Sequence, residues 1–403
     1  MATLMATPSA VTPIAAPAAP SPLLQVYKRA PIDLVRGEGI RLYDVDGREF
    51  VDFTSGIAVN ALGYGDAGLR EAMHAAADGL IHVSNLFRTS PGEQLAQRLV
   101  ELSFAERVFF CNSGVEANEG AFKFARRWAR TVGSLAKHEI VAVRGSFHGR
   151  LFASLAATDR PAYRAPFRPL AGGVSIAERD IDTLGGLLSA ETVAALVIEP
   201  IQGEGGVRVL DAGYLRELRA LTRERRIALI FDEIQCGLGR TGHLFAYQRV
   251  NVEPDLMTLA KPIAGGLPMG AILMTEEIAA AIQPGDHGTT FGGGPFVASV
   301  ARHVLDRVAD PALLDSVRTN GEWLGESLKA MAGRTGRIRD VRGAGYIWGI
   351  DVHEPASEVI PRAREEGLLL VGAGDHTLRI LPPLVATRAD LEDGLRRLER
   401  ALG

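Results

Sequence analysis

The chain has 403 residues, enough for two ordinary domains or for one large α/β domain with a smaller partner. Hydrophobic residues make up 47% and charged residues 23%, which is typical of a soluble globular enzyme and excludes a collagenous or disulfide-rich scaffold. The formal net charge of -4 provides no overall attraction to nucleic acid or to anionic lipid. We therefore expect neither a nucleic-acid partner nor a membrane partner.

Three features bear on location and metal binding. Cys111 and Cys236 stand alone, which predicts buried thiols in a reducing cytoplasm and no metal site. No apolar run approaches the roughly 18 residues that a membrane helix needs. Residues 1–24 are uncharged and rich in Ala and Pro, which predicts a disordered tail of undefined role. Because the first basic residue is Lys28, neither a signal peptide nor a mitochondrial presequence is expected, and a cytoplasmic location is predicted.

The first regular structure expected along the chain is a β-hairpin. Residues 39–53 alternate apolar and polar side chains on both sides of an Asp46-Gly47 turn. From about residue 91 the pattern changes to helices that alternate with short apolar runs. Each run has the length of a buried strand: RVFFCN, HEIVAVRG, VAALVIEP, IALIFDEI, PDLMTLA and GAILMT.

Helices are expected between these runs. Residues 113–132 and 214–226 repeat apolar side chains every three to four positions. Alternation of strand and helix predicts an α/β fold with a largely parallel sheet that is covered on both faces. After residue 295 come further helical stretches, two segments at 338–352 and 377–384 that resemble strands of a second sheet, and a charged helix at 388–401.

Three chemically distinctive groups follow the apolar runs, where ligands of α/β sheets bind. Ser113-Gly114-Val115 opens a helix, whose free N–H groups suit a phosphate, although a serine there is more often only a helix cap. Asp232 ends an apolar strand and needs a cationic partner such as a pyridinium, or else caps the next turn. Lys261 ends another strand, where desolvation would make its amine nucleophilic, although an isolated lysine is more often solvated. The occurrence of a phosphate cradle, an aspartate and a lysine in this chain order is a more specific signal than any one of the three alone.

These residues lie in motifs that resemble the class III (ω-amino) aminotransferases, and most closely the acetylornithine aminotransferase branch. The resemblance covers about residues 25–390. Its motifs are VRGEGIRLYDVDGREFVDF, FFCNSGVEANEGAFKFAR, SFHGR, IEPIQGEGGV, IFDEIQCGLGRTG, TLAKPIAGGLPMGA, HGTTFGGGP and LRILPPL. It implies a pyridoxal-phosphate (PLP) transferase of fold type I. In this fold, a large domain with a mostly parallel central sheet is joined to a smaller α+β domain made from the N- and C-terminal segments.

The resemblance also implies roles for single residues. Lys261 would carry pyridoxal 5'-phosphate as a Schiff base and move the substrate proton, and Asp232 would keep the pyridine nitrogen protonated. The phosphate would bind Ser113, Gly114 and Val115, and Thr290 of a neighbouring subunit, so a homodimer with shared active sites is implied. Further cofactor-binding residues would be Phe147 against the ring face, His148, and Gln235 near the 3'-oxygen.

Substrate binding is implied for two arginines and a glutamate. Arg150 would bind the carboxylate remote from the reacting amine, and Arg379 the α-carboxylate of glutamate or 2-oxoglutarate. When an ω-amine enters, Glu204 would pair with Arg379, because an unpaired buried arginine costs several kcal/mol, of order ~3–5. Tyr27 is a further candidate for the substrate carboxylate.

The implied domains are a tail at 1–24, an N-terminal segment at 25–60 that packs with the small domain, a large cofactor-binding domain at 61–294 and a C-terminal small domain at 295–403. The chain departs from the family pattern at Val115, which offers only its backbone N–H, and at Gly294. It departs again at Pro262, which favours an extended backbone at Lys261. These departures remove no reactive group.

The leading expectation is transfer of the ω-amino group of N-acetylornithine to 2-oxoglutarate, giving N-acetylglutamate 5-semialdehyde and glutamate in arginine biosynthesis. Ornithine, succinylornithine, succinyldiaminopimelate, 4-aminobutyrate, putrescine and a lysine-pathway carrier adduct remain alternative substrates. An aminomutase resembling the glutamate semialdehyde enzymes is a second class, and it would need no amino acceptor. A binding module without activity is a third class, which would usually have lost the lysine that this chain retains.

Overall fold

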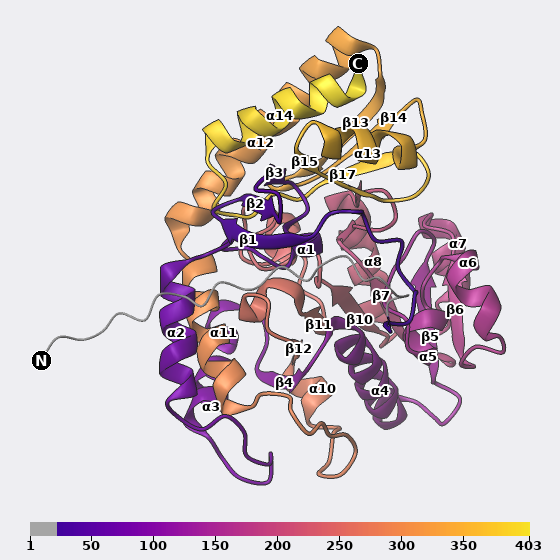
Figure 1. The fold of residues 1–403 in the computed structure, drawn as a ribbon. Helices are drawn as coiled ribbons and strands as arrows, with labels where there is room; N and C mark the ends of the chain where they lie inside the picture. Colours follow the sequence, from indigo (N-terminus) through magenta and orange to yellow (C-terminus); the bar gives the residue numbers. More distant parts are fainter. Residues whose placement is uncertain (1–21) are drawn as a thin grey trace, which may run out of the picture.

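A seven-stranded sheet forms the centre of the computed structural model, which describes residues 22–403 (Figure 1). All but three residues of the predicted tail, 1–24, lie outside the described residues. The strand order is β4-β12-β11-β10-β7-β5-β6, and only β12 runs antiparallel to its neighbours. The bounds are Arg107–Cys111 for β4, Gly270–Met274 for β12, Leu256–Leu259 for β11, Ala228–Asp232 for β10, Val193–Ile198 for β7, Glu139–Val143 for β5 and Val174–Ala177 for β6.

The six strands predicted from apolar runs are confirmed. The remaining strand, β6, was not predicted, because it is short and only partly buried at the sheet edge. The two predicted helices are also confirmed as α4, Gly114–Val132, and α8, Ala212–Glu224.

Helices α4 and α8 cover opposite faces of this sheet (Figure 1). Side chains alternate between the two faces along a strand. In β10, Ala228 and Ile230 belong to the same buried cluster as the inner side of α4, whereas Leu229 and Phe231 belong to the cluster that includes α8. Asp232 continues the first set, so its carboxylate is directed toward α4.

Further helices enclose the sheet. In Figure 1, α2, Ala67–Ala77, and α3, Ser90–Leu102, lie beside α11, Pro295–Val308. The short helices are α1 Ser55–Ala58, α5 Phe152–Ala156, α6 Pro161–Arg164, η1 Ala165–Phe167, α7 Ile181–Leu187, α9 Ala246–Val250, η2 Lys261–Ala264 and α10 Glu276–Ala279.

A second sheet is built from the C-terminal part of the chain, as predicted. Its order is β13-β14-β17-β16, with bounds Ile338–Ala344, Ile347–Val352, Thr377–Ile380 and Val371–Gly372. The strands pair antiparallel, and Arg379 of β17 is opposite Gly349 of β14. The helices of this part are α12 Pro311–Thr335, α13 Ala356–Glu365 and α14 Arg388–Leu402.

The beginning and the end of the described chain lie side by side. Strands β1, Leu34–Glu38, β2, Arg41–Asp44, and β3, Glu49–Asp52, form the N-terminal sheet, and the hairpin predicted around Asp46-Gly47 is confirmed. Strand β15, Leu368–Leu369, pairs parallel to β3.

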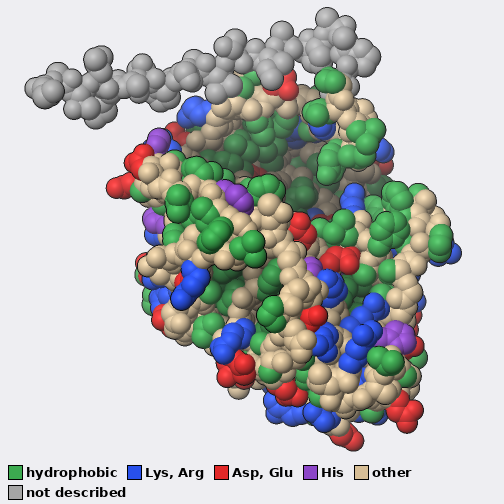
Figure 2. Space-filling view, turned by 90° about the horizontal axis from the view of Figure 1, so that it is seen from below, with side chains coloured by type: hydrophobic (Ala, Val, Ile, Leu, Met, Phe, Trp, Pro, Cys, Tyr) green, Lys and Arg blue, Asp and Glu red, His purple; other side chains and the backbone are tan. Residues whose placement is uncertain are grey.

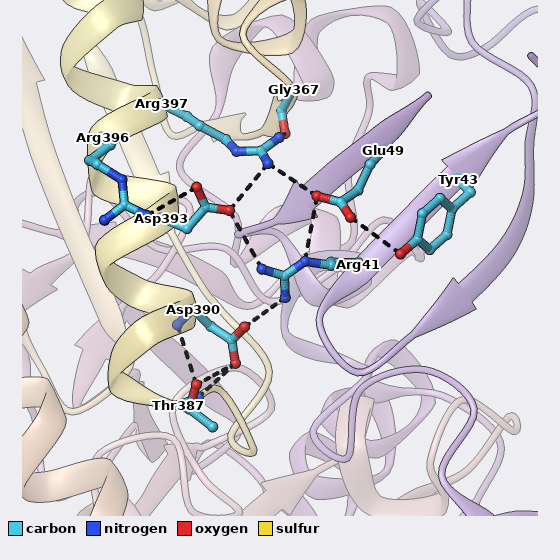
Figure 3. Close-up of polar contacts among 9 residues, drawn as sticks. All are labelled: Arg41, Tyr43, Glu49, Gly367, Thr387, Asp390, Asp393, Arg396 and Arg397. Atoms are coloured by element: carbon cyan, nitrogen blue, oxygen red, sulfur yellow. Dashed lines mark hydrogen bonds and ion pairs between the residues drawn. The ribbon is translucent and has the colours of Figure 1, made fainter. Parts of the chain in front are cut away.

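A charge cluster joins the same two regions (Figure 3). Arg41 of β2 forms an ion pair of 2.6 Å with Asp390 of α14, and Arg397 of α14 forms one of 3.1 Å with Glu49 of β3. The N-terminal segment therefore packs against C-terminal elements. The exact domain bounds, 25–60, 61–294 and 295–403, stay a prediction. No helix within residues 22–403 is long and apolar enough to span a membrane.

Candidate active site

A cavity of about 450 Å³ lies beyond the carboxyl ends of the parallel strands. This edge is where ligands of such sheets bind. Ten of the residues singled out from the sequence line this cavity: Ser113, Gly114, Val115, Phe147, His148, Arg150, Glu204, Asp232, Gln235 and Lys261. Segments that are far apart in the chain therefore meet at one site.

Asp232 lies at the floor of the cavity and is 4% exposed. Its Oδ2 accepts a hydrogen bond of 2.8 Å from Asn118 Nδ2 and lies 2.8 Å from His148 Nδ1, while Oδ1 accepts one of 3.1 Å from the Ile234 N–H. Asn118 is itself fixed, because its Oδ1 accepts a hydrogen bond of 2.9 Å from Thr258. These donors hold the carboxylate in one orientation and leave it capacity for a further donor.

Lys261 follows β11 and lines the same cavity. Burial lowers the pKa of Lys261 below its usual range, and the Asp232 carboxylate opposes that decrease. A lowered pKa increases the fraction of neutral, nucleophilic amine.

The prediction of an extended backbone at Lys261 is wrong. Its φ is +42°, in the left-handed region, because the chain turns at once from β11 into η2. The Ile263 N–H closes this turn with a hydrogen bond of 3.0 Å to the Ala260 carbonyl. Such conformations persist only where the surroundings enforce them, so the turn fixes the point from which the lysine enters the cavity.

The N-terminus of α4 forms a second wall. The Ser113 hydroxyl caps the helix by accepting from the Glu116 N–H at 3.3 Å, and the Glu116 carboxylate accepts from the Asn112 N–H at 2.5 Å. The N–H groups of Gly114 and Val115 have no acceptor inside the helix, as for any first turn. A Cβ at Gly114 would lie 2.8 Å from Ile234 Cδ1, so a larger residue there would displace the Ile234 side chain. This wall suits an anion.

Arg379 and Glu204 form an ion pair beside the cavity. Arg379 is 1% exposed, and its Nη2 lies 2.7 Å from Glu204 Oε1. Its Nη1 donates to Gln235 Oε1 at 2.8 Å and its Nη2 to the Gly372 carbonyl at 3.2 Å. The Arg379 Nε is buried without a partner among the described residues. The guanidinium therefore retains the ability to bind a carboxylate.

Two residues that line the cavity, Phe147 and Arg150, contact the ring of Tyr163 in α6. The Arg150 guanidinium lies over the Tyr163 ring at 4.3 Å, and the Phe147 ring meets the same ring edge-on at 6.5 Å. The Phe147 N–H donates to Glu199 Oε1 at 2.9 Å. The Tyr163 ring therefore packs against both Phe147 and Arg150.

Three residues expected from the resemblance are not among those that line this cavity. Arg379 lies beside it, against Glu204. Tyr27 is 67% exposed, and Thr290 is exposed in the loop before α11. Thr290 was assigned to the cavity of a neighbouring subunit, so its position within its own chain leaves that prediction in place.

Two further residues that line the cavity, Asn118 and Glu199, were not predicted from the sequence. Asn118 occupies an interior position of a helix, where asparagine is unfavourable, and this was the available signal. Glu199 follows strand β7 and directly precedes a proline, in IEPIQGE. Burial raises the pKa of Glu199 to about 7, although the nearby His148 opposes the shift.

Glu233, which follows Asp232 in the chain, is not among the residues that line the cavity and holds the start of α9. Its oxygens accept from the Ala246 and Tyr247 N–H groups at 2.5 and 2.7 Å, and burial raises its pKa to about 8. An acid whose pKa is raised on folding binds a proton in the folded state that the unfolded state has lost. Its stabilising contribution is therefore complete below pH ~4.5 and is lost as the pH rises through about 8.

We expect the free energy of unfolding to fall between these pH values more steeply in the wild type than in a Glu233→Gln variant. The difference in slope should approach about 1.4 kcal/mol per pH unit, the value for one proton. Urea unfolding at a series of pH values measures both slopes, and equal slopes would show that Glu233 does not bind this proton.

Comparison with known proteins places the site in a family. The aminotransferase class-III family model matches residues 25–402. The chain belongs to the class III aminotransferases. Members of this family are PLP-dependent transaminases of fold type I. The family accounts for a lysine, an aspartate and a helix N-terminus in one cavity.

Individual members of the family cover nearly the whole chain. A mitochondrial acetylornithine aminotransferase from Alnus glutinosa is 46% identical to this chain. The match covers 94% of this chain and 85% of the Alnus protein. The solved N-acetylornithine aminotransferase from Stenotrophomonas maltophilia is 37% identical, with a TM-score of 0.82 over 93% and 96% of the two chains. The ornithine aminotransferase from Toxoplasma gondii is 29% identical, with a TM-score of 0.90 over 94% and 92%.

Proposed function

We propose that this class III aminotransferase transfers the ω-amino group of N-acetylornithine to 2-oxoglutarate, giving N-acetylglutamate 5-semialdehyde and glutamate. The buried pair of Arg379 and Glu204 is the observation that carries the proposal, because it provides a binding group for glutamate that can be neutralised when an ω-amine is bound. The similarity to acetylornithine aminotransferases supports the choice of amine.

The cavity residues fit pyridoxal 5'-phosphate. The first turn of α4 offers N–H groups to a phosphate, and the buried Asp232 can accept a hydrogen bond from a protonated ring nitrogen. Lys261 supplies the amine, and Phe147 supplies an aromatic face. The bound cofactor supplies a carbonyl that takes up the amino group and an electron sink for the reacting carbon.

In this reaction Lys261 has two tasks. Its lowered pKa makes its amine available as a nucleophile, and its Nζ then accepts the proton from the substrate carbon and returns it. Asp232 keeps a positive charge on the ring nitrogen, because a buried carboxylate that is held by three donors favours a cationic neighbour.

The two substrates are distinguished at Arg379. Glutamate carries a carboxylate next to its amine, and this carboxylate displaces Glu204 from Arg379. An ω-amine lacks that carboxylate, so Glu204 stays at 2.7 Å and neutralises the arginine. Arg150, held over Tyr163, binds the carboxylate at the far end of either substrate.

We expect Glu204→Ala to lower kcat/KM for the ω-amine at least about tenfold while kcat/KM for glutamate changes by less than about threefold. Without Glu204 the buried Arg379 stays uncompensated when the amine is bound. Single-turnover measurements of each half-reaction test this, with Glu178→Ala at an exposed site as the control. Equal losses of kcat/KM in the two half-reactions would contradict the proposed role of Glu204 in neutralising Arg379.

An aminomutase is the less favoured function, because it has no glutamate half-reaction for the Arg379 and Glu204 pair to gate. The two functions separate in one assay. Turnover of the amine that depends on added 2-oxoglutarate supports the aminotransferase, and isomerisation without an acceptor would support the aminomutase.

A homodimer is part of the proposal. Loops 78–89 and 283–294 both lie at the lower end of the molecule in Figure 1. Asn85 Nδ2 connects them by donating to the Thr289 and Gly292 carbonyls at 3.0 and 3.1 Å. The view from below in Figure 2 shows hydrophobic side chains around a hollow. The two loops expose several large apolar side chains, which suit a subunit interface: Leu80, Ile81, Leu86, Phe87 and Phe291. Thr290 lies among them, as a residue shared with a neighbouring site would. A cytoplasmic location stays a prediction.

A further inference from the structure

Glu204 belongs to a tight loop, residues 203–207, between β8, Ile201–Gln202, and β9, Arg208–Val209. The Val207 N–H donates to the Gly203 carbonyl at 3.3 Å and closes the loop, and Val207 has a φ of +52°. At its start, the Gly203 N–H donates to Glu199 Oε2 at 3.0 Å. The Glu204 side chain is 24% exposed, so it has room to rotate away from Arg379.

One arginine holds this loop from the side of α6. Arg160 directly precedes that helix, and its Nη2 donates to the Glu204 backbone carbonyl. Arg160 lies 44 positions from Glu204 in the chain, so the contact exists only in the folded protein. A hydrogen bond from a charged donor is among the stronger single contacts that could fix this carbonyl.

A second arginine binds the same loop two residues further along the chain. Arg342 Nε of β13 donates to the Gly206 carbonyl at 2.7 Å. Ion pairs of 2.6 Å with Asp340 and 2.8 Å with Asp351 orient its guanidinium. Its Nη2 also donates at 3.3 Å to the hydroxyl of Thr377, two positions before Arg379 in β17. Arg342 therefore ties the loop to the strand that carries the partner of Glu204.

We propose that Arg160 and Arg342 are positioning residues that hold the backbone carbonyls of Glu204 and Gly206, so that the switch works by rotation of the Glu204 side chain alone. This inference rests on the proposed function. With the backbone held, Glu204 returns to Arg379 whenever no substrate carboxylate is there. With the backbone released, Arg379 is left without its partner more often, which harms the ω-amine and leaves glutamate unaffected.

The test uses Arg160→Met, which keeps an unbranched side chain and removes the donors. We expect kcat/KM for the ω-amine half-reaction to fall about tenfold, the scale for loss of a charged hydrogen bond, and kcat/KM for glutamate to stay within about twofold. Arg160→Lys should restore most of the selectivity, because it keeps a donor. Arg400→Met is the matched control: this exposed arginine of α14 pairs with Glu366 at 2.6 Å, and neither residue belongs to the loop or to the cavity lining.

The outcomes are distinct. Equal losses for both substrates, or no loss with Arg160→Met, would overturn the positioning role. A wild type that reacts with neither substrate would instead overturn the proposed function. Arg342→Met should shift selectivity in the same direction. Should that variant fail to fold, because Asp340 and Asp351 lose their partner, the Arg160 series alone decides.

Discussion

Lys261→Ala should abolish turnover, with a loss of at least about 10³-fold in each half-reaction, and should remove the visible absorbance of the lysine-bound cofactor near ~400–430 nm. In the proposed mechanism, the lysine is both the covalent attachment and the group that moves the substrate proton. No other lysine lines the cavity, so nothing among the described residues can take its place. Absorbance spectra and single-turnover kinetics of the purified variant measure both effects.

The matched control is Lys329→Ala, at an exposed position of α12 outside the cavity. It should leave the spectrum and the rates unchanged. Full turnover by Lys261→Ala would overturn the assignment of the reactive lysine, even with the family established.

Asp232→Asn should lower turnover at least about 100-fold while part of the cofactor stays bound. The variant keeps the size of the side chain but removes the negative charge that, in the proposed mechanism, favours a cationic ring nitrogen. It also places an amide group among Asn118, His148 and the Ile234 N–H, which all meet a carboxylate in the wild type. The α4 N-terminus and Lys261 remain to hold the cofactor. Cofactor content and turnover, measured on the same sample, separate binding from chemistry.

Asp211→Asn provides the control for Asp232→Asn. Asp211 caps α8 with hydrogen bonds of 2.7 and 3.1 Å, and asparagine caps a helix about as well. Wild-type activity in Asp232→Asn would show that the ring nitrogen has another partner.

Most strands and the N-terminal hairpin could be predicted from the sequence, because the patterns that indicate them are local. Buried strands give continuous apolar runs, and the hairpin around Asp46-Gly47 has its own turn residues. Asp232 and Lys261 were found because a charged residue at the end of such a run conflicts with burial. Strand β6 was not predicted, because a half-exposed edge strand does not give a continuous apolar run.

The remaining features depend on contacts between distant segments. Nothing local marks Asn118 as the donor to Asp232, because 114 positions separate them. Arg342 reaches Gly206 across 136 positions, and neither residue belongs to a motif that suggests the pairing. The positive φ of Lys261 contradicts the preference that Pro262 imposes, because the tight turn after β11 overrides it.

The central claim is that one site exchanges amino groups with N-acetylornithine and with glutamate. Its most direct test mixes the cofactor-loaded protein separately with N-acetylornithine, ornithine, 4-aminobutyrate and glutamate, and follows the loss of visible absorbance. We predict fast loss with N-acetylornithine and glutamate and slow loss with the other two. Faster loss with ornithine or 4-aminobutyrate would contradict the proposed amine, and no loss with any of the four would contradict the proposed function.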